Sequence, residues 1–180
     1  IYISTMLGGS VYANSGNNYV WVNEMRAGSV QLLSTGGLKE SGWIGYARGG
    51  SVSIHGAFLS VNQMSNGTHY VKVGGTELIT GGMYAYGGQQ SILSGGYGTI
   101  NSLSANSTAW NQVVLAGGLG RINYALQGKQ WISSGGVGSI AWIGWSNFAG
   151  GVTQNIVAGG TGQIDNLVNN AKGTQLVLGV

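Results

Sequence analysis

Cysteine and proline are both absent from this chain of 180 residues. Without cysteine, the chain can form neither disulfide bonds nor thiolate metal sites. Without proline, and without glycine at every third position, it cannot form a collagen-like triple helix. No run of apolar residues approaches the roughly 18 that indicate a membrane-spanning helix.

Charged residues are also scarce, at 6% of the chain, with seven Lys or Arg against four Asp or Glu. The basic residues are scattered, so we expect no surface that binds nucleic acid. Hydrophobic residues make up 43% of the chain, which argues against a disordered linker. The chain should therefore fold, with Ser, Thr, Asn, Gln and Gly covering most of its surface.

Glycine, by contrast, occupies 36 positions, one in five, against an average usage of about 7%. Much of it occurs in a recurring Gly-Gly pair. Aligning the repeats on this pair places its second glycine at Gly37, Gly56, Gly75, Gly96, Gly118, Gly136 and Gly160. The intervals average about 20 residues, a repeat length that is typical of solenoids.

Two apolar columns follow from this repeat. One contains Ile100, Ile122, Ile140 and Ile164, each four residues after the glycine pair. The other contains the second residue after Gln31, Gln90, Gln112, Gln130, Gln154 and Gln175, which is always Leu, Ile or Val. The residue between varies, and such alternation is typical of a strand with one buried side.

The pattern predicts an all-β parallel β-solenoid of about 8 coils with roughly 20 residues each. Residues 28–180 form one continuous repeat domain in this interpretation, and residues 1–27 form an atypical first coil or an N-terminal cap. Irregular intervals indicate that one corner accepts insertions, around 102–111 and 145–150. We also expect stacked side-chain hydrogen bonds between Asn101 and Asn123 and between Gln112 and Gln130.

Aromatic residues provide the candidate binding sites. Trp43 and Trp142 lie 99 residues apart, and each begins a Trp-Ile-Gly motif six positions after a glycine pair. The repeat places them at the same structural position on two coils, a position that Tyr124 shares. The residues that follow them are apolar and predicted to point inward, so the three aromatic rings point outward.

Trp131 is predicted to point outward as well, between Gln130 and Ile132. Exposed rings of this kind could stack on sugars or pack against another molecule. The alternative is that they fold onto the corner and cover neighbouring glycines. For Tyr46 and Trp145 we expect packing in the core or at the corner, because they keep the parity of the buried isoleucines.

The acidic residues are too few for an obvious catalytic site. Glycoside hydrolysis needs two carboxylates flanking one bond, and Glu40 and Glu77, about two coils apart, are the nearest approach to such a pair. We therefore expect no catalytic residues, with a polysaccharide-degrading enzyme as the weakest alternative. His55 and His69 have no third ligand nearby, so we expect exposed or turn histidines, no metal site and no cofactor.

Units such as Gly87–Gly96 and Gly128–Gly136 carry the phrase Gly-x-Gln-x-φ-x-Ser-Gly-Gly, where φ is apolar. They resemble the repeats of AIDA-type autotransporter passengers, a family of adhesins of Gram-negative bacteria, over roughly residues 27–180. The resemblance implies a right-handed parallel β-helix, export through a C-terminal barrel that this sequence lacks, and a place on the bacterial surface. It also implies adhesion or self-association, with sugars on the matching serines Ser94 and Ser134.

Three functions therefore remain open. The first is a surface adhesin segment that binds other copies of itself or a glycan or protein on a cell surface. The second is a structural spacer or filament subunit whose ends stack. The third is the β-helix enzyme.

Overall fold

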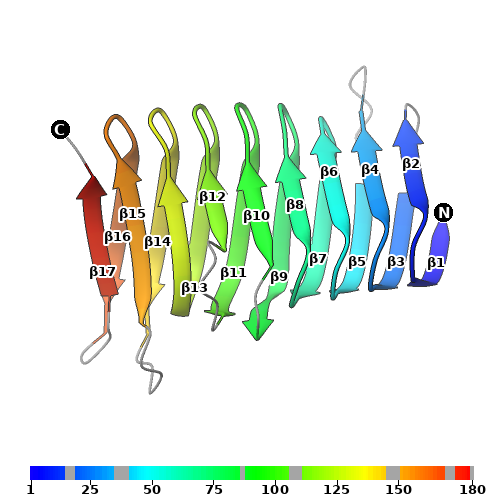
Figure 1. Cartoon of the computed structure of the whole chain (residues 1–180), viewed down its shortest axis with the longest axis horizontal. Coiled ribbons are helices and arrows are strands. Elements are labelled where there is room, and N and C mark those ends of the chain that lie inside the picture. The colour runs from blue at the N-terminus through cyan, green and yellow to red at the C-terminus, as the bar shows by residue number, and fades with distance from the viewer. Residues whose placement is uncertain are drawn as a thin grey trace.

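The computed structural model describes residues 1–14, 19–34, 41–85, 88–105, 111–144, 151–168 and 173–178. In these ranges the chain forms strands and turns only, and none of them contains a helix long and apolar enough to cross a membrane. Successive strands climb from the N-terminus at one end of the molecule to the C-terminus at the other (Figure 1). The chain is a parallel β-solenoid with coils of about 21 residues, consistent with the right-handed β-helix expected from the sequence.

Each coil contributes one strand to each of two sheets, which we call sheet A and sheet B. Sheet A contains β1 (Tyr2–Met6), β3 (Tyr19–Met25), β5 (Ser41–Ala47), β7 (Phe58–Met64), β9 (Thr76–Ala85), β11 (Tyr97–Ala105), the first part of β13 (Leu119–Ile132), β14 (Val137–Ile143) and β16 (Thr161–Leu167). Sheet B contains β2 (Ser10–Asn14), β4 (Ser29–Leu33), β6 (Ser51–His55), β8 (Thr68–Val71), β10 (Gln89–Ile92), β12 (Gln112–Val114), the second part of β13, β15 (Val152–Val157) and β17 (Gly173–Leu178). The strands of residues 1–27 pair in the same parallel manner as the later ones.

The predicted isoleucine column is confirmed. Ile100 pairs with Ile122, Ile122 with Ile140, and Ile140 with Ile164. The first three are fully buried, and Ile164, near the C-terminal end, is partly buried against the same core. The column stacks like on like because the period-two alternation points the same side chain inward on every coil.

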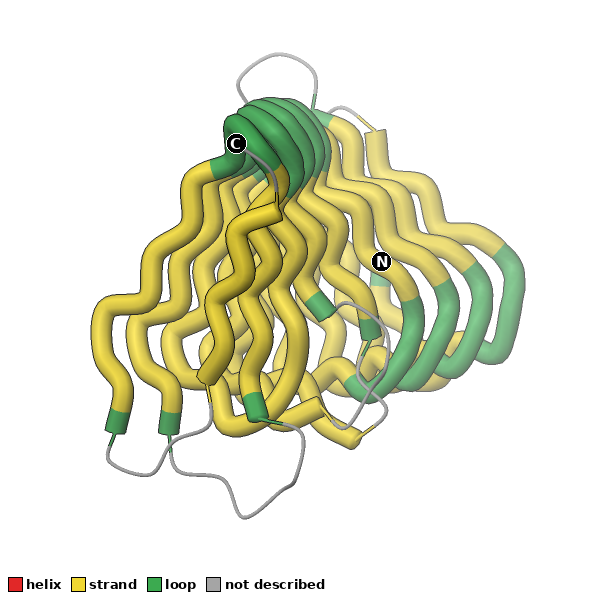
Figure 2. The backbone as a smooth tube through the Cα atoms, turned by 60° about the vertical axis from the view of Figure 1, so that its left-hand side comes forward, coloured by secondary structure: helices red, strands yellow, loops and turns green. Residues whose placement is uncertain are grey.

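The Gly-Gly pair serves two separate purposes, which Gly95 and Gly96 illustrate. Gly95 has a φ of 70°, a backbone conformation that favours glycine. A Cβ on Gly96 would lie 2.5 Å from the carbonyl oxygen of Val71 in the preceding coil, so a side chain has no room. These turns join sheet B to sheet A and stack closely in the later coils (Figure 2).

The glycine alignment needs one correction. Gly56 has a φ of 65° and lies against Gly74, the first glycine of the next pair. Gly56 therefore occupies the first position of the repeating pair and not the second. Ala57 takes the second position, because Thr76 bonds to its carbonyl as Tyr97 bonds to that of Gly75. Gly37 lies outside the described residues.

A row of hydrogen-bonded amides runs through the core of the later coils, and we call it the glutamine ladder. It consists of Gln90, Gln112, Gln130, Gln154 and Gln175, which are paired in register on sheet B. The first four are fully buried. Each Nε2 from Gln112 onward donates to Oε1 of the preceding glutamine, over 2.7, 2.5, 2.6 and 2.6 Å. The predicted stacks of Gln112 on Gln130 and of Asn123 on Asn101 are thus both present.

Glycines on sheet A make room for this ladder. Gly98, Gly120, Gly138 and Gly162 form a column on the strands that face the amides. A Cβ on Gly98 would lie 2.8 Å from Gln90 Oε1, and one on Gly120 would lie 2.9 Å from Gln112 Oε1. The glycine of each Gly-x-Ile phrase on sheet A therefore leaves space for the glutamine of a Gln-x-φ phrase on sheet B.

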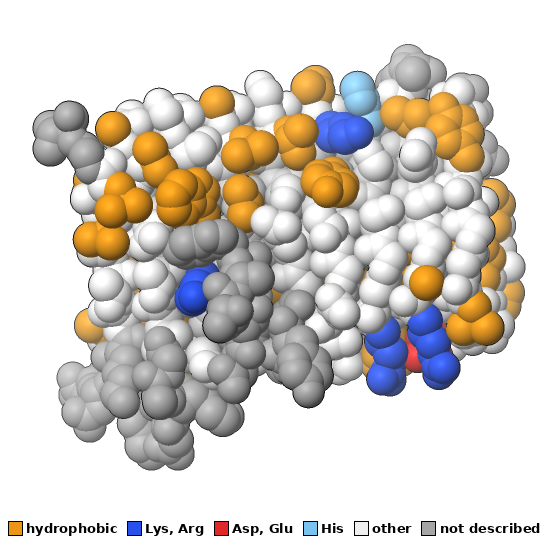
Figure 3. Space-filling model, in the orientation of Figure 1, with side chains coloured by type: hydrophobic (Ala, Val, Ile, Leu, Met, Phe, Trp, Pro, Cys, Tyr) orange, Lys and Arg blue, Asp and Glu red, His pale blue; other side chains and the backbone are white. Residues whose placement is uncertain are grey.

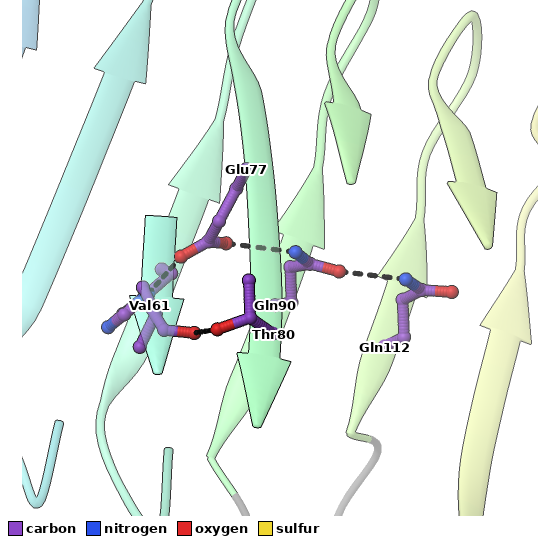
Figure 4. A network of polar contacts seen from close by, with 6 residues as sticks. Val61, Glu77, Thr80, Gln90 and Gln112 are labelled. Carbon is purple, nitrogen blue, oxygen red and sulfur yellow. Dashed lines mark hydrogen bonds and ion pairs between the residues drawn. The ribbon is translucent and has the colours of Figure 1, made fainter. Parts of the chain in front are cut away.

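The N-terminal end of the ladder is closed by a buried acid and histidine. Gln90 Nε2 donates to Glu77 Oε2 over 2.9 Å (Figure 4). Glu77 Oε1 pairs with His69 Nδ1. Both residues are fully buried, so the expectation of an exposed or turn His69 was wrong. His69 lies in the ladder's own column, between Val52 and Gln90, where an apolar series changes into an amide series. His55 is exposed, as expected.

Gln31 does not belong to the ladder, contrary to the sequence alignment. It is exposed, pairs with Tyr12 and Ser53, and leaves Leu32, not Leu33, in the core. The ladder column in the early coils contains Val11, Val30 and Val52 instead. Aligning β4 by its glutamine alone therefore shifted the predicted register by one residue. A shift of one residue exchanges the buried and the exposed side chains of a strand.

Candidate binding surface

The two Trp-Ile-Gly motifs are not at the same structural position. Trp43 pairs with Trp21 and Ser60, whereas Trp142 pairs with Tyr124 and Asn166. Ile44 belongs to the column of Ile140, so the motifs are three residues out of phase. The physical reason is length: seven residues separate β4 from β5 and only four separate β12 from β13, so counting from a glycine pair fails for Trp43.

Sheet A carries an exposed aromatic cluster over its first coils, formed by Tyr2, Tyr19, Trp21 and Trp43. The ring centroids of Trp21 and Trp43 lie 4.4 Å apart, and those of Tyr2 and Trp21 lie 6.5 Å apart. Tyr19 adds a third contact to Trp21, at 6.1 Å. Tyr2 is 73% exposed and Trp21 38%, whereas Trp43 is half-buried. We call this the N-terminal aromatic cluster.

Sequence reasoning missed most of this cluster, because residues 1–27 were set apart as atypical. The sequence did contain a sign of the cluster, since Trp21 and Trp43 are 22 residues apart, which is about the length of one coil. Parallel pairing in register puts such residues side by side. The in-register pairing that stacks apolar side chains in the core also stacks these aromatic side chains on the outer face of the sheet.

The other predicted aromatic residues are divided between two sheets. Tyr124 and Trp142 pair directly on sheet A and are 40% and 49% exposed, which agrees with the outward orientation predicted for them. Trp131 lies on sheet B between Val113 and Asn155 and is half-buried. These three side chains therefore do not form one continuous surface.

Tyr46 is exposed within β5, so its predicted packing in the core or at the corner was wrong; Trp145 lies outside the described residues. In β5 both Ile44 and Gly45 are buried in succession, and the alternation changes phase there. The same change occurs at Ile140 and Ala141 of β14. This phase change turns Tyr46 outward, where it contacts the guanidinium of Arg48.

Ser94 and Ser134 are exposed in the turn that joins sheet B to sheet A. Each lies directly over a glycine of the next coil: a Cβ on Gly117 would approach Ser94 Oγ to 2.8 Å, and one on Gly159 would approach Ser134 Oγ to 2.6 Å. The two serines occupy equivalent places in the stack. Their modification by sugar stays a prediction.

The acids do not form a catalytic pair in the described residues. Glu77 is fully buried, and its two oxygens are engaged by His69 and Gln90. Glu40 lies outside the described residues, and exposed Asp165 accepts a hydrogen bond from Gln163. No group of three His, Cys, Asp or Glu that could hold a metal ion occurs in the described part of the chain.

Glu24 is the centre of a small charged group at the end of sheet A. Its Oε1 lies 3.1 Å from Arg26 Nε and 2.8 Å from Arg48 Nε. The hydrogen bond from Arg26, with smaller contributions from the charges of Arg26 and Arg48, holds the pKa of Glu24 below its ordinary value. Because the pKa is lowered in the folded chain, the stabilisation is present above the ordinary pKa and is lost as the pH falls through the lowered one.

Replacing Arg26 by alanine is expected to raise the pKa of Glu24 towards its ordinary value. Carbon-13 NMR of the side-chain carboxyl during an acid titration measures this shift. The same titration in high salt should also raise the pKa in the unsubstituted chain, because exposed charges are screened. An unchanged midpoint in the Arg26→Ala variant would contradict the assignment of this hydrogen bond.

Outside the grey atoms, the face in Figure 3 consists mainly of uncharged polar side chains, backbone and hydrophobic side chains, and its Lys and Arg are few, with two of them together beside an acidic side chain. Beside the turns, Tyr97, Leu119 and Val137 pair in sequence and form an exposed apolar row, 40, 47 and 42% exposed. They line a shallow depression together with Arg121 and Ser139. The outer faces thus offer apolar and amide contacts with little Coulomb repulsion.

Comparison of this chain with family models, with curated proteins and with solved structures found no match.

Proposed function

We propose that the chain is an adhesive segment of a bacterial surface protein of the autotransporter-passenger type, and that it acts by contact between copies of its outer faces. The proposal combines the repeat resemblance with the composition of the surface. Its enclosing protein would reach the cell surface through a translocator domain. The β-solenoid is the scaffold that presents the contacts.

The N-terminal aromatic cluster is the observation that carries this proposal. Four aromatic rings stand on the outer face of sheet A, where the fold does not need them for its core. Tyr2 and Tyr19 are 73% and 46% exposed. Large aromatic side chains contribute strongly to protein contacts because they bury much apolar area with few rotatable bonds.

Low charge makes lateral contact favourable. Only 6% of the residues are charged, so two copies approach with little repulsion. Exposed apolar side chains occur on several coils, and weak contacts at several of them then add through multivalency. A self-associating surface protein works in this way, since every copy on one cell faces a copy on the next.

Replacing Tyr2 and Trp21 together by serine is expected to abolish or strongly reduce clustering of beads coated with the chain. The matched control is Tyr70→Ser, which removes an exposed ring from sheet B, where Tyr70 is 41% exposed. Clustering is measured by light scattering, and circular dichroism checks the fold of each variant. Undiminished clustering of the double variant would contradict the proposal.

A second arm of the same experiment presents the coated beads to immobilised glycans. Binding there with no bead clustering would replace self-association by glycan adhesion. The alternative of a polysaccharide-degrading enzyme has less support, because Glu77 is enclosed in the core and does not reach a substrate.

A further inference from the structure

Asn66 and Gly67 form the one Asn-Gly dipeptide of the sequence, and they lie in the turn between β7 and β8. Asn66 is exposed, and Gly67 has a φ of 100°. β7 pairs with β5 on one side and with β9 on the other, so this turn belongs to the middle of the rod and not to one of its ends.

The backbone N–H of Gly67 makes its hydrogen bond within the turn and not with the preceding coil. It donates to Oδ1 of Asn66 over 2.8 Å, a local bond that Asn side chains commonly accept. On either side, the N–H of Asn66 donates to the carbonyl of Ala47 over 3.4 Å and that of Thr68 to the carbonyl of Gly50 over 3.0 Å. The nitrogen of Gly67 therefore lies beside the side-chain amide of Asn66 and is not held by the bonds that join the coils.

This arrangement brings a nucleophile and an electrophile of one dipeptide together. The electrophile is Cγ of Asn66, the carbon bonded to the oxygen that the N–H of Gly67 contacts. Reacting atoms that are already held close together need little further ordering before a bond forms between them. Glycine also carries no side chain that would shield its nitrogen or restrict the backbone as the ring closes.

We propose that Asn66 is a site of spontaneous deamidation in the folded chain, through a cyclic imide with Gly67. Hydroxide removes the proton from the nitrogen of Gly67, this nitrogen bonds to Cγ of Asn66, and the side-chain amino group takes a proton from water and leaves as ammonia. Water then adds to one of the two imide carbonyls and breaks its bond to nitrogen. The product is aspartate or isoaspartate, according to which carbonyl is attacked.

The new carboxylate changes the surface because the chain has so few charges. It is a fifth acid in a chain with four, and it lowers the formal net charge from +3 to +2. It arises next to Ser65, which lines a shallow depression together with Arg48, so the new charge lies on the same part of the surface as the Glu24 group. The proposal does not depend on the adhesive function of the outer faces.

Incubation of the whole folded chain in mildly alkaline buffer tests this inference. Mass spectrometry of its proteolytic peptides detects the replacement of NH₂ by OH at each asparagine. The reference site is Asn101, which is exposed on sheet A, donates to the carbonyl of Thr80 over 3.0 Å and precedes Ser102 within β11. Conversion at Asn66 should be at least about tenfold faster than at Asn101, because only Asn66 has the following nitrogen held beside its amide.

A synthetic peptide of residues 63–70 shows the same reaction without the fold. The folded chain should convert Asn66 no more slowly than the peptide does, because the turn already places the two reacting groups together. Slower conversion in the folded chain would show that the stacked turn protects Asn66 and would overturn the proposal. Conversion at Asn66 no faster than at Asn101 would overturn it as well.

The Asn66→Gln variant identifies the reacting residue. It keeps the side-chain amide but has to close a larger ring, so it should lack the acidic shift that the unsubstituted chain shows on isoelectric focusing after the same incubation. An equal shift in this variant would place the reaction at another residue and contradict the proposal.

Discussion

The chain with Glu77→Leu is expected to lose about 2–6 kcal/mol of unfolding free energy, because it leaves two buried polar groups unpaired at about 1–3 kcal/mol each. Leucine leaves Gln90 Nε2 without its acceptor and leaves His69 Nδ1 unpaired. His69 Nε2 already has no hydrogen-bond partner, so the ring would be buried with both nitrogens unsatisfied. Urea denaturation followed by tryptophan fluorescence measures the loss. The expected loss is large compared with a typical free energy of unfolding of about 5–15 kcal/mol.

Glu77→Gln is the matched control, because it keeps the shape and replaces one carboxyl oxygen by an amide nitrogen. Its amide oxygen can still accept from Gln90, and its amide nitrogen can donate to His69 Nδ1 in the other tautomer of the ring. We expect a much smaller loss than for leucine. Equal losses in the two variants would show that the hydrogen bonds of this side chain do not account for the loss.

Gln130→Leu is expected to cost about 2–6 kcal/mol, because it leaves two buried groups unpaired at about 1–3 kcal/mol each. Gln112 Oε1 loses its donor, and Gln154 Nε2 keeps only a contact of 3.4 Å to the carbonyl of Gln163. Leucine fills a similar volume, so the loss reports mainly on the broken ladder. Urea denaturation again provides the measurement.

Gln31→Leu is the control for this prediction. Gln31 belongs to the same sequence phrase as Gln130 but lies exposed on sheet B. Its replacement should change stability by no more than about 0.5 kcal/mol, as for most surface substitutions. A loss as large as that of Gln130→Leu would mean that Gln31 also lies in the core and that β4 has the other register.

The fold could be predicted from the sequence because its determinants are local and repeated. The offset from the glycine pair to the isoleucine is short and constant in the later coils, so Ile100 to Ile164 align without knowledge of the corners. The same counting failed at Trp43, where three extra residues enter the connection before β5. Tyr46 was misread because the alternation of faces changes phase within the strand.

The buried pair could not be found in the same way. His69 and Glu77 are eight residues apart and lie on different sheets, and their contact exists only because the coil brings β8 opposite β9. The glutamines were identified as a stack, but their position in the core follows from sharing parity with the buried residue two positions later. That parity was available in the sequence and predicts the inward orientation of Gln112 and Gln130.

The glutamine ladder also has an electrostatic consequence. Every amide in the row carries a dipole, and because all of them point the same way, the dipoles add along the rod as peptide dipoles add along a helix. The positive end of the row lies at Gln90, against the carboxyl group of Glu77. Aligned hydrogen bonds also polarise their neighbours in the low-dielectric interior. The row from Gln90 to Gln175 thus carries an internal electric field whose positive end faces the one acidic group buried beside it.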